Sequence, residues 1–121
     1  MQHPVFSLSA ELVDAFATAS PIRATFWGVA GHDDRWDDLS PDGDAARAAV
    51  LADFAARAAA LPPATDARER LARQVLDDFL ALEQDALDAF DPAVDLNNLA
   101  SPPQLLTMAL ETLPAWVLGA G

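Results

Sequence analysis

The sequence contains no cysteine and no tyrosine. Without cysteine, disulfide bonds, thiolate nucleophiles and sulfur-based metal sites are excluded. No apolar run approaches the roughly 20 residues that a membrane-spanning helix needs. The N-terminus also lacks the basic segment and apolar core of a secretory signal,. We therefore expect a cytoplasmic protein.

Positive charge is scarce: the sequence has 7 basic and 19 acidic residues, which gives a net charge of −12. Every basic residue is an arginine, and all of them lie between Arg23 and Arg73. So acidic a surface repels phosphate backbones and anionic membranes. We expect neither a nucleic-acid nor a membrane partner, and we interpret the acidity as a means of solubility rather than as an acidic docking patch.

Alanine is the most frequent residue, and it favours helices because it loses no side-chain entropy there,. β-Branched and aromatic residues, which favour strands, are few,. A chain of 121 residues is long enough for one domain,. We predict an all-α fold of about five helices in an irregular antiparallel helical array, a single helical region over residues 1–121 that is part of a larger helical fold.

Proline, glycine and serine mark the expected helix ends. Ser40-Pro41 and Ser101-Pro102 each combine an N-cap residue with a proline at the first helical position,. Asp66, followed three residues later by Glu69, forms a capping-box pattern,. Helices are predicted over residues 9–19, with Ser9 as N-cap, and over 22–27, 41–60, 66–90 and 102–113.

Apolar residues spaced by three and four predict the buried face of each helix. The pattern is longest in the fourth helix. Four phenylalanines are predicted to pack in the core rather than to form a stacking surface. The predicted core of the fourth helix comprises Leu71, Val75, Phe79, Leu82, Ala86 and Phe90, and the four phenylalanines are Phe16, Phe54, Phe79 and Phe90.

One polar loop concentrates the candidate site residues. It supplies an imidazole and four carboxylates, which could bind Ca²⁺, Mg²⁺ or Mn²⁺. The alternative, which we favour, is a solvated loop whose aspartates bond nearby backbone N–H groups. Trp27 and Trp36 are predicted to anchor it. The candidates are Gly31, which permits the turn, His32, Asp33 and Asp34 as polar contacts, and Arg35 as a partner for the carboxylates.

Known catalytic and cofactor motifs are missing from the sequence. It has no Gly-rich phosphate loop, no Gly-x-Ser-x-Gly elbow, no His-Glu-x-x-His and no EF-hand loop,. We therefore assign no catalytic, cofactor-binding or metal-binding residue and expect no cofactor on this chain.

Three segments of the sequence are PIRATFWGVAGHDDRWDDLSPDG, the break Leu61-Pro62-Pro63, and LNNLASPPQLLTMALETLP. Together they resemble the N-terminal region of the bacterial domain-of-unknown-function 885 family. The resemblance extends to Pro114. The matching positions are Pro21, Gly31-His32-Asp33-Asp34, Ser40-Pro41 and Asn98-Leu99-Ala100-Ser101-Pro102.

The resemblance implies a longer, all-helical protein similar to zinc metallocarboxypeptidases, whose His-Glu-x-x-His helix lies beyond the length of this chain. No zinc ligand is carried over, because no residue here matches that motif. The atypical tail at 115–121, AWVLGAG, looks like a truncated end.

Two alternative functions are therefore considered, and the first is the one we expect. The first is an N-terminal helical fragment of a metallopeptidase-like hydrolase, inactive alone, whose partner is the remainder of the larger enzyme. The second is a free-standing acidic interaction module that self-associates or docks a partner through its apolar faces.

Overall fold

The computed structural model describes residues 2–89, 102–114 and 119. These residues form five α-helices and contain no strand, so the predicted all-α fold is confirmed. Phe90, the Asn98–Ser101 turn and most of the predicted tail lie outside the described residues. The helices are α1 (Pro4–Ala19), α2 (Pro21–Trp27), α3 (Pro41–Ala59), α4 (Ala67–Ala89) and α5 (Pro102–Thr112).

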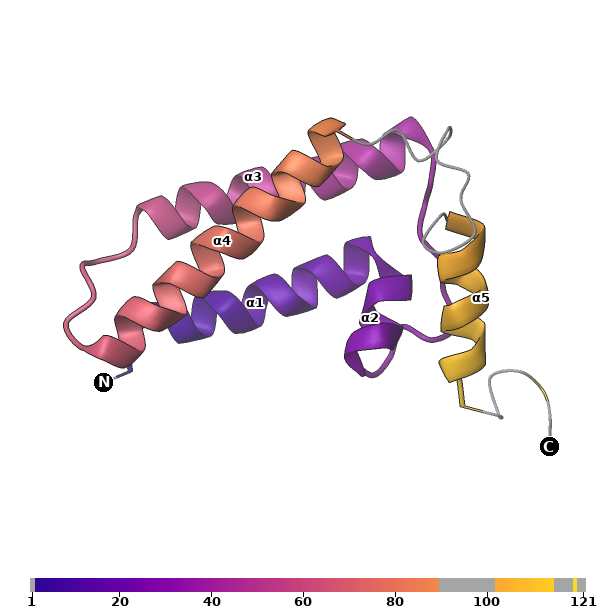
Figure 1. The fold of residues 1–121 in the computed structure, drawn as a ribbon, viewed down its shortest axis with the longest axis horizontal. Coiled ribbons are helices and arrows are strands. Elements are labelled where there is room, and N and C mark those ends of the chain that lie inside the picture. Colours follow the sequence, from indigo (N-terminus) through magenta and orange to yellow (C-terminus); the bar gives the residue numbers. More distant parts are fainter. Residues whose placement is uncertain (1, 90–101, 115–118, 120–121) are drawn as a thin grey trace.

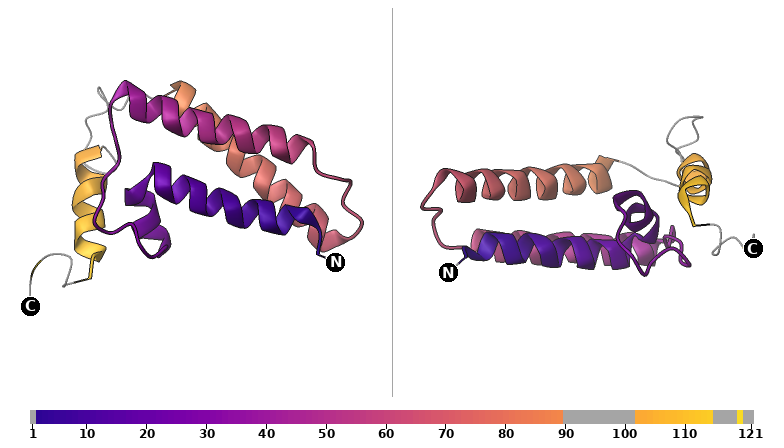
Figure 2. Two further views of the ribbon diagram at one scale, coloured as in Figure 1. Left: turned by 180° about the vertical axis from the view of Figure 1, so that it is seen from behind. Right: turned by 90° about the horizontal axis from the view of Figure 1, so that it is seen from below.

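The three long helices form two layers. α1 and α3 run antiparallel and side by side, and α4 crosses over both of them (Figure 1). The view from below in Figure 2 shows α4 as a separate layer above α1 and α3. The short α2 turns away at the end of α1 and packs against α5. None of the described helices is long and apolar enough to span a membrane.

Proline occupies the first turn of α1, α2 and α3, where its missing N–H costs no helical hydrogen bond,. The start predicted for the first helix is wrong: α1 begins at Pro4 rather than near Ser9. His3 caps it, since Nδ1 of its ring accepts a 3.1 Å hydrogen bond from the Val5 N–H. Ser9 lies inside the helix, where its hydroxyl donates to the Val5 carbonyl at 2.7 Å.

The start of α4 uses the predicted capping residues in a modified pattern. Asp66 Oδ1 accepts a 2.8 Å hydrogen bond from the Glu69 N–H, as an N-cap residue does,. The Glu69 carboxylate accepts from the N–H of Thr65 at 2.6 Å and from its hydroxyl at 2.8 Å. In a standard capping box the Glu69 carboxylate would accept from the N–H of the N-cap residue, Asp66, whereas here it accepts from the residue before it, Thr65,.

One apolar core joins α1, α3 and α4. Each of these helices contributes side chains to it at helical spacing, as burial of one face requires. Its members are Val5, Leu8, Leu12, Phe16, Leu51, Phe54, Ala58, Leu76 and Leu80.

The buried face predicted for α4 is wrong for most of its described residues, although Phe79 packs half-buried against the core. Leu76 and Leu80 enter the core, whereas Leu71, Val75 and Leu82 are 65%, 60% and 68% exposed. Leu76 and Leu80 are four residues apart, and Leu71, Val75 and Leu82 are spaced by four and seven, so each set lies on one face and α4 is apolar on two faces,. Periodicity cannot tell which of two apolar faces is buried, because that depends on the helices packed against it.

Three aromatic rings pack together where α1, α2 and α4 meet. The Phe16 ring centroid lies 5.7 Å from that of Trp27 and 5.8 Å from that of Phe79. Trp27 and Phe79 are 6.1 Å apart. Phe16 is buried and Phe79 half-buried. Trp27 thus joins α2 to the aromatic core, while Trp36, which was expected to anchor the loop, is largely exposed.

Candidate functional site

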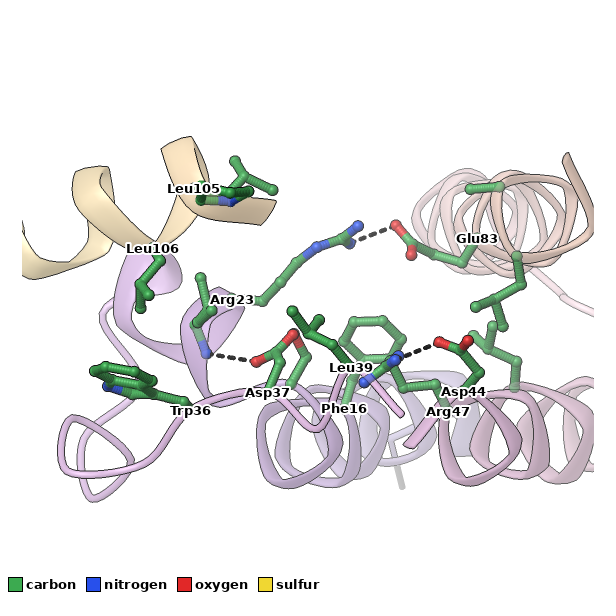
Figure 3. A pocket seen from close by; sticks show the side chains of 16 residues that line it. Phe16, Arg23, Trp36, Asp37, Leu39, Asp44, Arg47, Glu83, Leu105 and Leu106 are labelled. Atoms are coloured by element: carbon green, nitrogen blue, oxygen red, sulfur yellow. Dashed lines mark hydrogen bonds and ion pairs between the residues drawn. The ribbon is translucent and has the colours of Figure 1, made fainter. Parts of the chain in front are cut away.

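The first concave site is a cavity of about 420 Å³, called here the central cavity, which is lined by residues of all five helices and of the loop between α2 and α3 (Figure 3). Its wall is mainly apolar, with a few charged side chains, which is the usual make-up of small-molecule sites. The apolar wall includes Phe16, Ile22, Leu39, Leu51, Leu105 and Leu106, and the charged residues are Arg23, Asp37, Asp44, Arg47 and Glu83.

Two ion pairs neutralise most of the charge in the central cavity. Arg23 Nη1 lies 2.5 Å from Glu83 Oε1, which links α2 to α4. Arg47 Nη2 lies 2.5 Å from Asp44 Oδ1, one turn apart on α3. The Arg23 guanidinium also lies 5.4 Å from the centre of the Phe16 ring, within cation–π range,. These groups satisfy one another, as partly buried charges must.

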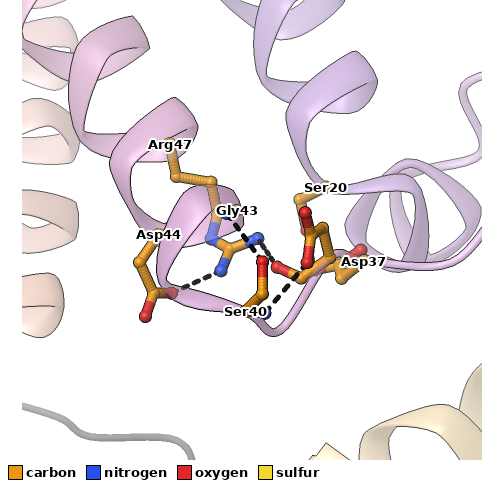
Figure 4. A network of polar contacts seen from close by, with 7 residues as sticks. Ser20, Asp37, Ser40, Gly43, Asp44 and Arg47 are labelled. Carbon is orange, nitrogen blue, oxygen red and sulfur yellow. Dashed lines mark hydrogen bonds and ion pairs between the residues drawn. The ribbon is translucent and has the colours of Figure 1, made fainter.

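Asp37 caps a helix that precedes it in the sequence. Its Oδ1 accepts a 2.9 Å hydrogen bond from the Ile22 N–H, and its Oδ2 accepts one of 2.6 Å from the Ser20 hydroxyl. Ser20 precedes α2 but makes no side-chain cap of its own. Asp37 therefore takes the N-cap role for α2 and fixes the loop against it (Figure 3),. Figure 4 shows Asp37 next to Ser20, beside the polar contacts at the start of α3.

The buried Arg47 fixes the end of the same loop to α3. Its Nη1 donates a 2.9 Å hydrogen bond to the Asp38 carbonyl. Ser40 caps α3 by accepting a 3.3 Å bond from the Gly43 N–H. Its own N–H donates to the Asp38 carboxylate at 2.9 Å, and hydrogen bonds from Ser40 lower the pKa of Asp38.

Gly43 permits this loop to approach α3 closely. A Cβ atom on Gly43 would lie 1.9 Å from the Asp38 carbonyl oxygen, far inside van der Waals contact. The close approach brings that oxygen within reach of Arg47. An isolated glycine in a helical pattern signals such a contact, and it is the one signal that could have located this network from the sequence.

The loop residues chosen from the sequence do not converge on one point. Gly31 has a φ of 93°, so it supplies the turn that was expected of it. Arg35 Nη2 lies 2.5 Å from Nδ1 of His32, so its partner is the ring rather than a carboxylate. Asp33 accepts a 2.9 Å bond from the Thr25 hydroxyl, and Asp34 is exposed.

A metal ion would need several of these donors together. In the part of the chain that the structure describes, no group of three or more His, Asp or Glu side chains is placed to hold one. Asp33, Asp37 and Asp38 instead accept hydrogen bonds from hydroxyl and N–H groups of the protein,.

A second concave site of about 600 Å³ lies between α1 and α4, called here the α1/α4 groove. Its wall is almost wholly apolar. Val13 and Trp27 are each 41% exposed, and Val75 is more exposed still. The groove was not expected from the sequence, because Val75 was assigned to the core. Its lining residues are Ser9, Leu12, Val13, Phe16, Trp27, Val29, Val75, Leu76 and Phe79.

Comparison with known proteins gives one match. The family described as "Bacterial protein of unknown function (DUF885)" matches residues 21–116. No curated protein and no solved structure matches the chain. The family match includes α2 through α5 and thus both concave sites in large part. Because it covers well over half of the sequence, the chain belongs to this family of bacterial proteins.

Proposed function

We propose that this chain forms the N-terminal helical part of a larger, metallopeptidase-like hydrolase, in which it supplies packing surface rather than catalytic groups. One observation carries the proposal: α4 exposes a second apolar face. The membership of the family supports it, together with the resemblance of that family to helical zinc peptidases.

The exposed face of α4 suits burial against a further body. Leu71, Val75 and Leu82 are all more than half exposed. Val75 lines the α1/α4 groove, and the two leucines lie on the same face of α4 as Val75,. Monomeric soluble proteins expose few large apolar side chains in one contiguous patch. Such a patch indicates an interaction surface.

The polar groups of the central cavity suit a structural role. Arg23 pairs with Glu83, and Arg47 pairs with Asp44. A general acid or base needs access to a reacting proton, whereas these groups are engaged with one another. The described residues also do not fit a zinc ion, which takes three or four nitrogen, sulfur or carboxylate ligands at one point,.

Sequencing of the source locus past codon 121, in every frame, tests the proposal. The expected result is a continuation that encodes further amphipathic helices and a His-Glu-x-x-His motif. An immediate stop with no such motif in any frame would overturn the proposal.

The second candidate function is a free-standing interaction module. The continuous core of α1, α3 and α4 favours it, since three helices that share one core can fold as a unit. Such a module unfolds in urea in one sharp transition that several probes report together. A part of a larger body with uncovered apolar surface should instead unfold over a broad range, and different probes should report different midpoints.

A further inference from the structure

The α1/α4 groove continues along α4 as a straight apolar stripe. Leu71, Val75 and Leu82 are spaced by four and seven residues, so they lie on one face of the helix,. From residue 71 to residue 82 the stripe is about 17 Å long, from the rise of a helix per residue. Val13 of α1 and Trp27 at the end of α2 form the opposite wall. A stripe of this length and shape matches a second helix.

Carboxylates follow one side of the stripe. Asp78 and Asp85 each lie three residues after an exposed apolar residue, Val75 and Leu82, and so on the adjoining face of α4,. Asp78 accepts a 2.8 Å hydrogen bond from the neutral amide of Gln74. In the described part of the chain no arginine pairs with Asp78 or Asp85. The rim of the groove is thus an uncompensated row of negative charge.

We propose that the α1/α4 groove binds an amphipathic α-helix with a cationic flank, supplied by the remainder of the larger protein. The apolar side of that helix covers the exposed stripe, and its lysine or arginine side chains face Asp78 and Asp85. This inference rests on the proposed function for the source of the helix. The chemistry of the helix follows from the groove itself.

Charge argues against a second copy of this chain as the occupant. Two chains of net charge −12 repel each other, and the repulsion is concentrated at the acidic C-terminal half of α4,. From residue 77 onward α4 contains Asp77, Asp78, Glu83, Asp85 and Asp88 and no cation. Arg73 pairs with Asp77 and Arg23 with Glu83, so Asp78, Asp85 and Asp88 are the carboxylates without an arginine partner among the described residues. A cationic helix converts the same charges into attraction and adds electrostatic specificity to the apolar contact.

Synthetic helices provide the probe. One peptide of about 18 residues, long enough to cover the stripe, has leucine at helical spacing and lysine on the flanks. The second has the same leucines with glutamate in place of lysine. Each is titrated into the full chain by calorimetry at low and high salt. We expect the lysine peptide to bind at least about tenfold tighter and to weaken with salt, since screening acts on exposed charges.

Matched variants separate groove binding from general attraction to an acidic protein. The double variant D78N/D85N should weaken the lysine peptide about fivefold, in line with the strength of exposed ion pairs. The double variant D42N/D53N removes the same charge from α3 and should change the affinity little. Val75→Ser should also weaken binding, whereas Met108→Ser, an exposed apolar residue on α5, should not.

The outcomes separate this inference from the proposed function. Equal affinity for the glutamate peptide, equal losses from the α3 variants, or no binding of either peptide would each overturn the cationic helix as occupant. A gene that continues into a hydrolase would leave the proposed function intact in all of these cases. Selective lysine-peptide binding by a chain whose gene ends at codon 121 would overturn only the source of the helix.

Discussion

Asp37 and Ile22 lie fifteen residues apart in the sequence, and the Asp37 carboxylate accepts a 2.9 Å hydrogen bond from the Ile22 N–H. This bond caps the N-terminus of α2. A cap that comes from outside its own helix couples two elements. The loop after α2 holds the start of α2 in place, and α2 in turn packs against α5.

Removal of this cap should destabilise the fold. We expect Asp37→Ala to lower the free energy of unfolding by about 1–2 kcal/mol, the usual cost of a lost N-cap. Urea denaturation followed by circular dichroism measures it. Asp34→Ala is the matched control, since Asp34 is exposed in the same loop, and it should change stability little. Equal losses from both variants would show that Asp37 does not cap α2.

Gly43 should resist a substitution that normally stabilises helices. Replacing an exposed helical glycine with alanine usually raises the free energy of unfolding by up to about 1 kcal/mol. At Gly43 the new Cβ would overlap the Asp38 carbonyl. We therefore expect Gly43→Ala to destabilise the protein by about 1–3 kcal/mol, as overpacking does. A gain in thermal stability would refute the close approach of this loop to α3.

Two leucines of α4 test which face is buried. Leu80 is buried in the core, whereas Leu82 is exposed. We expect Leu80→Ala to cost about 2–5 kcal/mol of unfolding free energy. Leu82→Ala should stay within about 0.5 kcal/mol of the wild type, as surface substitutions do. The reverse order in urea denaturation would restore the face that the sequence pattern predicted.

Acid should loosen the start of α4. Hydrogen bonds from the Thr65 N–H and hydroxyl lower the pKa of Glu69 below its ordinary value of 4.5. The stabilisation is complete above pH 4.5 and is lost as the pH falls through the lower folded pKa, because the unfolded chain takes up the proton first. Glu69→Gln should therefore reduce the loss of thermal stability in that acid window. An unchanged acid dependence would contradict this role.

Divalent cations should leave the loop at residues 31–38 unaffected. Its described donors are spread over separate hydrogen bonds rather than gathered at one point. A ligand that binds only the folded state raises the melting temperature. We expect no such rise with millimolar Ca²⁺ or Mn²⁺. A rise that is lost in Asp33→Asn would revive the cation site.

Local signals made most helix ends predictable. Proline at positions 41 and 102 sets a helix start through its own fixed φ and missing N–H, so neighbouring residues suffice for the prediction. The missed start at Pro4 has the same signal, with His3 in place of a more usual capping residue. The Ser9 hydroxyl, taken as a cap, donates backwards inside the helix.

Long-range contacts were not predictable in the same way. Arg23 and Glu83 are sixty residues apart, and nothing near either residue indicates the other. Asp37 was one of four similar aspartates in its loop, and only the fold selects it to cap α2. The buried face of α4 depends likewise on α1 and α3. The positions at which the sequence pattern failed are thus the exposed apolar residues that form the proposed docking surface.

The isolated position of α5 has a consequence for amide hydrogen exchange. Among the described helices, α5 packs against α2 alone. Its backbone amides can therefore exchange through a partial opening that separates α2 and α5 and leaves the three long helices folded. The amides of α3 around Leu51 and Phe54, which lie in the core, require global unfolding. Exchange in α5 should accordingly be faster and less sensitive to low concentrations of denaturant than exchange in α3.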